Sequence, residues 1–196
     1  MSRAYCPACE RPQRTCLCDA LVTLAPPCEL VVLQDPTESR HALSSAPLLH
    51  RAIEGSRLVV DEVCQPEVLL GSQWRTDTLL IYPGPTALDG PKARARGFRR
   101  VLLLDGTWRK VRRLIHCNPW LLELPCLALA PDAGSEYRIR KSPRRDGLST
   151  IEAAVAALNL LYPDQDYSPV LGAFHKMIDL QIAAMGDAVY RENYPA

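Results

Sequence analysis

The sequence contains no apolar run long enough to span a membrane, and its first residues, MSRAYCPACE, lack the apolar core of a signal peptide. We therefore expect a cytoplasmic protein without a membrane partner. In that compartment the eight cysteines would be reduced thiols or metal ligands rather than disulfides. Internal repeats and low-complexity tracts are also absent. The lack of a P-loop or GxGxxG pattern counts against an enzyme that uses its basic residues to bind small phosphates.

A strong overall charge is missing too, because the formal net charge is only +1. The basic residues are nevertheless concentrated. Of 23 lysines and arginines, nine lie within residues 92–113 and five within 138–145, and Asp105 is the only acid in either stretch. Such a locally basic surface is typical of a protein that binds an anionic ligand or a nucleic-acid backbone, although a solvated charged face is the alternative.

The 196 residues, 47% of them hydrophobic, suffice for one domain of ordinary size with a small appendage. Continuous apolar segments rich in β-branched residues alternate with helix-like segments. This pattern predicts an α/β fold with a parallel-rich sheet and helices on both of its faces. The expected strands are residues 29–34, 57–63, 78–85, 100–107 and 126–131, and the expected helices are 44–54, 108–116, 148–163 and 169–187.

Four cysteines lie close together near the N-terminus, in the order Cys6-x-x-Cys9 and Cys16-x-Cys18. Zn²⁺ binds four thiolates tetrahedrally, and short CxxC loops bring two ligands to one ion. Four protein ligands leave the metal no open position, so we predict a structural zinc site; scattered free thiols are the alternative. Residues 1–28 are expected to form this zinc-binding unit, and residues 29–196 the main domain.

The stretch DGTW follows the predicted strand that ends near residue 105, and ligands bind at strand ends in open α/β sheets. Asp105 could act there as a base or hold a polar ligand group, and Gly106 allows the chain a sharp exit. The structural alternative is equally strong at this point. Thr107 could cap the following helix while Trp108 is part of the core.

Two other segments could share that edge of the sheet. The first is YPGP at residues 82–85, which could also be an ordinary turn. The second is LSTIE at residues 148–152, whose backbone N–H groups could bind a carboxylate or a base edge. Its Ser149 and Glu152 also have the spacing of a capping box, the more common explanation of such a pattern.

These segments together resemble the DTW-domain family. The cysteine pattern, YPGP, LLLDGTWRKVRRL, YRIRKSPRRDGLSTIEA and the helical tail occur in the order expected of that family, and they cover essentially the whole chain. The motifs are specific as a set. The family consists of tRNA-uridine aminocarboxypropyltransferases related to the SPOUT superfamily. The resemblance therefore implies a SPOUT-like fold whose C-terminal part forms a knot around an S-adenosylmethionine (SAM) pocket.

The reaction implied by the resemblance moves the 3-amino-3-carboxypropyl group of SAM to N3 of a uridine in tRNA and releases 5′-methylthioadenosine. SAM would be the co-substrate, tRNA the partner, and zinc the structural metal. Two alternatives stay open. A SPOUT-type SAM-dependent RNA methyltransferase would use the same fold, and a non-catalytic zinc RNA-binding protein would need only the basic stretches and the cysteines.

The matching residues define a candidate site. We expect Asp105 to act as general base or orienting group for uridine N3, Thr107 to form hydrogen bonds, and Trp108 to pack against cofactor or base. The cofactor-binding candidates are Tyr82, Pro83, Gly84, Pro85, Leu104, Asp105, Gly106, Leu148, Ser149, Thr150 and Glu152. The RNA-binding candidates are Arg109, Arg112, Arg138, Arg140 and Lys141, and the metal ligands are Cys6, Cys9, Cys16 and Cys18.

The loop after the first predicted strand departs from the family pattern. Relatives often have His-Pro-x-Glu there, with Asn-Thr further on. This chain has Asp35-Pro36-Thr37-Glu38, followed by Ser44-Ser45. No role is therefore carried over to the loop Asp35–Glu38.

Overall fold

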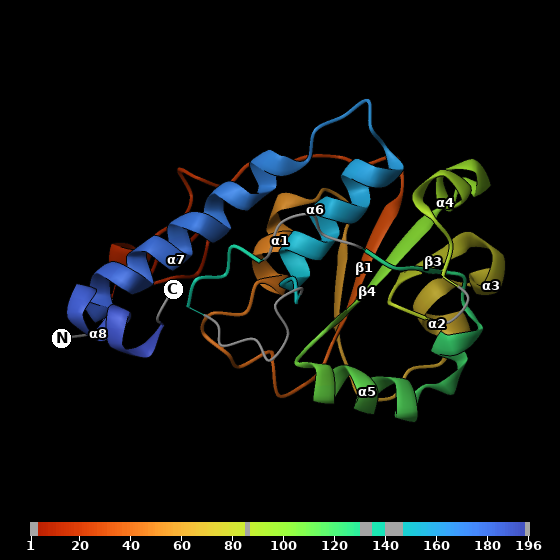
Figure 1. The fold of residues 1–196 in the computed structure, drawn as a ribbon, viewed down its shortest axis with the longest axis horizontal. Helices are drawn as coiled ribbons and strands as arrows, with labels where there is room; N and C mark the ends of the chain where they lie inside the picture. The colour runs from red at the N-terminus through yellow and green to blue at the C-terminus, as the bar shows by residue number, and fades with distance from the viewer. Residues whose placement is uncertain (1–3, 85–86, 130–134, 140–146, 195–196) are drawn as a thin grey trace.

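The computed structural model describes residues 4–84, 87–129, 135–139 and 147–194. Its centre is a five-stranded parallel sheet with the order β2-β1-β4-β3-β5 (Figure 1). The predicted α/β class and parallel sheet are therefore confirmed. The strands are β1 (Glu29–Gln34), β2 (Arg57–Val60), β3 (Thr78–Ile81), β4 (Arg100–Asp105) and β5 (Cys126–Leu127).

The strands lie where the apolar runs predicted them, but they end earlier. β3 ends at Ile81 rather than residue 85, and β4 ends at Asp105 rather than residue 107. Pro83 has no N–H to donate to a neighbouring strand, and Gly106 turns the chain away from the sheet. The polar residues that follow each run therefore lie in loops at the carboxyl edge of the sheet.

The predicted helices are also present, as α1 (Ala46–Ala52), α5 (Trp108–Cys117), α6 (Thr150–Leu161) and α7 (Leu171–Met185). α1 has only seven residues and was expected from its place between two apolar runs. The other short elements were not predicted, since segments of seven residues or fewer show little helical periodicity. They are α2 (Pro66–Leu70), α3 (Trp74–Asp77), α4 (Gly90–Arg96), α8 (Asp187–Asn193) and the 3₁₀ helices η1 (Gln13–Thr15), η2 (Pro119–Glu123) and η3 (Ser168–Val170).

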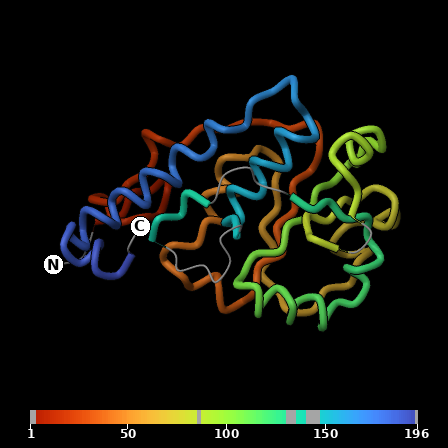
Figure 2. The backbone as a smooth tube through the Cα atoms, in the orientation of Figure 1, coloured from red at the N-terminus to blue at the C-terminus, as the bar shows by residue number. Residues whose placement is uncertain are grey.

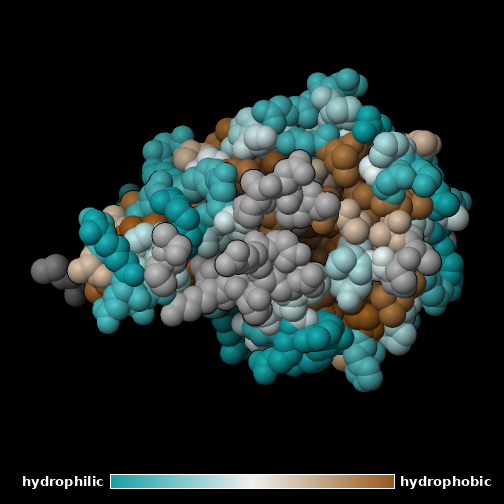
Figure 3. All heavy atoms as spheres, in the orientation of Figure 1, coloured by the Kyte–Doolittle hydropathy of each residue, from teal (hydrophilic) through white to brown (hydrophobic). Residues whose placement is uncertain are grey.

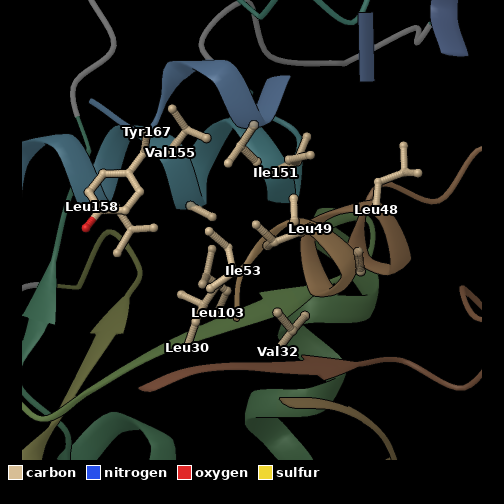
Figure 4. Packing of buried hydrophobic residues seen from close by; sticks show 14 of the residues in the cluster. Leu30, Val32, Leu48, Leu49, Ile53, Leu103, Ile151, Val155, Leu158 and Tyr167 are labelled. Atoms are coloured by element: carbon tan, nitrogen blue, oxygen red, sulfur yellow. The ribbon is translucent and has the colours of Figure 1, made fainter. Parts of the chain in front are cut away.

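Helices α1, α4 and α6 cover one face of the sheet, and α7 packs on α6. In the close-up, side chains of β1 and β4 point toward those of α1 and α6 (Figure 4). The labelled members of this core are Leu30, Val32, Leu48, Leu49, Ile53, Leu103, Ile151, Val155, Leu158 and Tyr167. Full burial of each such aliphatic side chain stabilises the fold by about 1.5–3 kcal/mol, so this layer fixes α6 firmly over β1 and β4.

The opposite face is covered by α2, α3, α5 and η2. The alternate residues of the same strands point this way, for example Leu33 of β1 and Leu102 of β4. They pack against Trp74 of α3, Leu114 of α5 and a leucine of η2, all of them buried. Helices therefore lie on both faces, as the apolar strand runs predicted.

The N-terminal segment runs beside α7 (Figure 2). Leu17 of this segment is completely buried within the main core. Arg51 of α1 forms an ion pair with Glu10 at 2.6 Å, and Lys176 of α7 pairs with Asp19. The cysteine-containing segment is thus attached to the main domain on two sides. No helix within the described ranges is both long enough and apolar enough to cross a membrane.

Candidate active site

The central strand β4 lies between β1 and β3. The connection that follows β4 lies on the opposite face of the sheet from the connections that follow β1 and β3. From β4 the chain continues into α5 on one face, whereas β1 and β3 lead to α1 and α4 on the opposite face. The connections therefore diverge on either side of the end of β4. In open parallel sheets such topological switch points are where ligands bind.

Asp105 is the last residue of β4, and its side chain is almost entirely buried. Gln34 is its register partner at the end of β1, and the Gln34 amide Nε2 donates to Asp105 Oδ2 at 2.7 Å. From the other side, the hydroxyl of Thr150 in the first turn of α6 donates to Asp105 Oδ1. Each of the two carboxylate oxygens thus accepts a hydrogen bond from a different element.

The turn after Asp105 is tight. Gly106 has a φ of 156°, and a Cβ at this position would lie only 3.0 Å from Cβ of Lys110. Thr107 is the N-cap of α5, since its hydroxyl accepts a hydrogen bond from the Lys110 N–H at 3.4 Å. The capping function that the sequence suggested for Thr107 is therefore confirmed.

Trp108 begins α5 and is half-buried. Its ring lies 6.4 Å from the ring of Tyr82, with a tilt of 51° between the two planes. Tyr82 follows β3, so this aromatic pair connects the loops after β4 and β3. The DGTW and YPGP segments consequently lie beside each other.

The described part of YPGP, residues 82–84, lies close to β5. The Tyr82 N–H donates to the carbonyl of Leu127 at 3.1 Å. A Cβ on Gly84 would lie 3.2 Å from Sγ of Cys126, so the backbone passes this strand at close range. Pro85, the last residue of the motif, lies outside the described residues.

The LSTIE segment begins α6 with a complete capping box. The Ser149 hydroxyl accepts from the Glu152 N–H, and Glu152 Oε2 accepts from the Ser149 N–H at 2.7 Å. Glu152 also accepts hydrogen bonds from the Ser135 hydroxyl and the Glu136 N–H. Glu152 therefore fastens residues 135 and 136 to the start of α6, while Thr150 contacts Asp105 and Leu148 is half-buried.

Residues 135–139 continue from that anchor toward the loop after β1. The Tyr137 hydroxyl donates to the carbonyl of Leu43 at 2.7 Å, and the Tyr137 ring packs edge-on against Phe174 of α7. The exposed Arg138 forms an ion pair with Asp179 of α7. Arg140 and Lys141, which the sequence analysis grouped with Arg138, lie outside the described residues.

The basic residues of α5 fall into two sets. Lys110 pairs with Glu38 at 2.8 Å, and Arg113 pairs with Asp35 at 2.6 Å. Arg109 and Arg112 are exposed, and neither forms an ion pair with any residue of the described ranges. In the space-filling view, hydrophilic side chains line the lower margin of the molecule, where α5 lies (Figure 3). Half of this basic cluster is therefore neutralised internally, and the rest is presented to solvent.

Asp35 is completely buried at the end of β1. Burial alone would raise the pKa of its carboxyl group, but the hydroxyl and N–H of Thr37 and the guanidinium of Arg113 outweigh burial and hold this pKa below its usual value. The same ion pair raises the pKa of Arg113. The carboxylate of Asp35 thus ties the loop after β1 to α5.

Sequence reasoning missed Gln34 and the function of Asp35. Both follow an apolar run, as Asp105 does, so the signal was the same: a polar residue at the end of a buried parallel strand. What the sequence lacked was the strand order. Only the pairing of β1 with β4 brings Gln34 beside Asp105.

The four N-terminal cysteines form a compact cluster. Their sulfur atoms all lie within 4.8 Å of one another, with Cys6 and Cys18 3.6 Å apart and Cys9 and Cys16 3.8 Å apart. Four thiolates placed tetrahedrally at about 2.3 Å from a zinc ion would lie roughly 3.8 Å apart. The spacing of the four sulfur atoms therefore fits a metal ion with tetrahedral coordination.

The thiols of this cluster differ in acidity. Backbone N–H groups of Cys9 and Ala8 point at the Cys6 sulfur and lower its pKa from 9.0 to about 6. The adjacent sulfur atoms of Cys6 and Cys16 raise the pKa of Cys18 to about 12. The thiolate is the form that binds metals, and N–H groups aimed at a sulfur stabilise it. The cluster thus has the chemistry of a metal-binding group.

The chain is similar to one protein family and to several named proteins. Residues 3–182 match the family described as the DTW domain. A Mus musculus protein named tRNA-uridine aminocarboxypropyltransferase 2 is 32% identical over 176 residues, and its Macaca fascicularis namesake 29% over 174. An Arabidopsis thaliana protein named tRNA-uridine aminocarboxypropyltransferase A is 25% identical over 195 residues, which cover 83% of this chain and 74% of the relative.

Both mammalian matches cover 81% of this chain, and the chain spans 57% of the length of each of these relatives. No solved structure matches the chain. The family match begins before the cysteine cluster and extends through β4, α6 and most of α7, so it includes every segment of the candidate site. The chain belongs to the DTW-domain family.

Proposed function

We propose that this protein transfers the 3-amino-3-carboxypropyl group of SAM to N3 of a uridine in tRNA, with 5′-methylthioadenosine as the second product. The observation that carries the proposal is the position of Asp105, buried at the switch point of the sheet and held by Gln34 and Thr150. The names of the relatives, all tRNA-uridine aminocarboxypropyltransferases, support this choice of reaction.

Asp105 would act on the uridine. N3 of uridine is a weak acid, so its attack on an electrophilic carbon requires that its proton be removed or oriented. The carboxylate, oriented by Gln34 and Thr150, would accept that N–H. Thr107 is engaged as the cap of α5 and would support the turn, and Trp108 would give one wall of the site together with Tyr82.

The residues around Asp105 fit SAM, which would supply an electrophilic carbon next to its sulfonium. The aromatic pair Tyr82 and Trp108 offers a surface for an adenine ring. Residues 82–84, Leu104 and Gly106 would frame the adenosine part, with Pro85 continuing that loop. The start of α6 would hold the methionine part through Leu148 and Thr150, since the Ser149 N–H is already bonded to Glu152. Glu152 would contribute indirectly, since both of its oxygens hold other parts of the chain.

We place the tRNA backbone along α5. Arg109 and Arg112 are exposed on that helix and form no ion pair with the described residues, and their spacing of three positions puts them on one side of it. Arg138 would extend this surface, because its partner Asp179 is exposed and such a surface ion pair is weak. Arg140 and Lys141 stay candidates for the same role. Lys110 and Arg113 are excluded from this role, because Glu38 and Asp35 already neutralise them.

We assign zinc to the cysteine cluster and keep residues 1–28 as a zinc-binding unit next to a catalytic domain of residues 29–196. The fit of four sulfurs to a tetrahedron supports this assignment. Four thiolates leave no open coordination position, so the metal would stabilise the segment rather than take part in transfer. Arg14, exposed within this unit, would extend the tRNA surface. None of the eight cysteines, all of them described, forms a disulfide, which supports a reducing, cytoplasmic location.

We also propose the SPOUT-type knot for the C-terminal part. After the edge strand β5, the chain returns to place α6 over the central strand β4. On the way, Tyr137 is hydrogen-bonded to the loop after β1. A crystal structure that traces residues 128–149 would test whether the connection passes through a loop of the sheet or lies over it.

The function is tested by incubating the protein with unmodified tRNA and SAM and then analysing nucleosides by mass spectrometry. We expect aminocarboxypropyl-uridine and released 5′-methylthioadenosine. A methylated nucleoside instead would identify a methyltransferase and overturn the proposal. SAM binding without any product, or tRNA binding without SAM binding, would also overturn it.

A further inference from the structure

We propose that Gln34 is a positioning residue for Asp105, and that it works through a chain of hydrogen bonds from Ser44 through Gln34 and Asp105 to Thr150. The inference deepens the proposed function and rests on it. It concerns a residue outside the DGTW, YPGP and LSTIE segments.

The contacts of the Gln34 side chain carry this inference. Its Nε2 donates at 2.7 Å to Asp105 Oδ2 and is also 3.0 Å from the hydroxyl oxygen of Ser44. Both N–H bonds of the amide are thereby used, which fixes the amide plane and its direction. Gln34 is 1% exposed, so water does not compete for these bonds. A buried amide without a hydrogen-bond partner lowers the stability of the fold, and here the amide is bonded to the acid at the proposed reaction centre.

The chain of hydrogen bonds joins four separate parts of the protein. Ser44 lies in the loop after β1, Gln34 ends β1, Asp105 ends β4, and Thr150 starts α6. Since Asp105 accepts hydrogen bonds from both Gln34 and Thr150, its carboxylate is restrained from rotating about the Cβ–Cγ bond. Small misplacement of a reacting group is costly in rate, so removal of the Gln34 donor should affect turnover more than ligand binding.

Charged groups on the surrounding elements must be considered in any pH experiment. Among the residues that the structure describes, they are Asp35, Glu38 and His41 from the loop after β1, Lys110 and Arg113 from α5, and Glu152 from α6. Asp35 and Glu38 are paired with Arg113 and Lys110, and Glu152 is bonded within its capping box. These groups are the same in the wild type and in the variants below, so the pH profile of the wild type is the reference for each variant.

Gln34→Met keeps the length of the side chain and removes its donor. We expect kcat for transfer to fall roughly 10- to 100-fold, with a much smaller change in KM for SAM and for tRNA. Gln181→Met on α7 is the matched control and should behave as the wild type. Ser44→Ala removes the outer end of the chain, and a loss of only a few-fold is expected.

Gln34→Glu tests the inference without relying on a loss of activity alone. It places a second carboxyl group within hydrogen-bond distance of Asp105, and two such groups do not both ionise readily. At low pH the introduced carboxyl group is protonated and can again donate to Asp105. The ratio of the variant rate to the wild-type rate should therefore rise as the pH falls. A ratio that stays constant or falls on acidification would contradict this arrangement.

The outcomes separate the two proposals. If the wild type produces no aminocarboxypropyl-uridine, the proposed function itself fails. If the wild type is active but Gln34→Met retains its full kcat, or the rate ratio of Gln34→Glu does not change with pH, the inference about Gln34 is overturned and the function stands. Melting curves of each variant identify any that fail to fold; Gln34→Glu measured over the pH range then decides the question.

Discussion

The cysteine cluster and the Asp105 site are assembled in opposite ways. The sulfur contacts of the cluster join residues 7 and 12 positions apart, all within one short segment. Asp105 instead contacts Gln34, 71 positions earlier, and Thr150, 45 positions later. The first arrangement depends on local spacing, which brings four sulfur atoms close enough to bind one metal ion. The second exists only when the sheet has formed and α6 has packed over it, so damage to each should have different consequences.

The largest effect is expected for the reaction centre. Asp105→Asn should lower transfer by roughly 10²- to 10⁴-fold, because the amide cannot accept the uridine proton as a carboxylate does. Nucleoside mass spectrometry after timed incubation measures the loss. Asp164→Asn, an exposed acid outside the site, is the control and should retain full activity. Unchanged transfer by Asp105→Asn would remove Asp105 from the mechanism.

Loss of a cysteine ligand should act mainly on stability. Cys9→Ser is expected to abolish zinc binding and, because Leu17 of the same segment is buried in the main core, to lower the Tm of the whole chain. A loss of about 3 kcal/mol corresponds to roughly 6–12 °C for a chain of this length. Calorimetry and metal analysis by mass spectrometry provide the measurements.

Cys64→Ser is the control for that experiment, since Cys64 lies outside the cluster. It should retain zinc. A wild-type protein purified without chelators that holds no zinc would contradict the metal assignment. An unchanged Tm for Cys9→Ser would show instead that the cluster stabilises nothing beyond itself.

Features that depend on local spacing could be predicted from the sequence, whereas contacts between distant segments could not. The cluster was visible in the spacing of its cysteines, and the strands and long helices were visible in their apolar runs. The capping box at Ser149 was likewise a local signal. The contacts of Gln34 and Asp35 could not be predicted from the sequence, because they depend on which strand lies next to β1. The ion pairs of Lys110 and Arg113 could not be predicted either, because their partners Glu38 and Asp35 lie 72 and 78 positions earlier in the chain.

A smaller effect is expected where the loop after β1 is fastened to α5. Arg113→Met leaves the buried Asp35 without its cationic partner and should lower the free energy of unfolding by about 1–2 kcal/mol at neutral pH. Chemical denaturation measures this change. Arg112→Met, which removes an exposed arginine without an ion pair in the described residues, should change stability by less than about 0.5 kcal/mol.

The pH dependence of that effect has a definite sign. Because the pKa of Asp35 is lowered in the folded protein, its contribution is complete above the unfolded value of about 4 and is lost as the pH falls through the lower folded value. The difference between wild type and Arg113→Met should therefore shrink on acidification below pH of about 4. A difference that stays constant there would contradict the role of the ion pair.

The smallest effect per residue is expected on the RNA surface. The double substitution of Arg109 and Arg112 by alanine should weaken tRNA binding and reduce the slope of log K against log salt by roughly one per lost phosphate contact. SAM affinity should change little. Arg191→Ala on α8 is the control. Filter binding measures the affinity for tRNA, and calorimetry measures the affinity for SAM. An equal loss of SAM affinity would contradict the assignment of these arginines to the RNA.

The central claim is that ligand chemistry belongs to the carboxyl edge of the sheet and metal binding to the N-terminal cluster. Hydrogen–deuterium exchange of the zinc-loaded protein with and without SAM tests this most directly. The account predicts that SAM slows exchange at residues 82–84, 104–107 and 148–150, while residues 6–18 exchange as before. Protection at residues 6–18, with none at the end of β4, would contradict it.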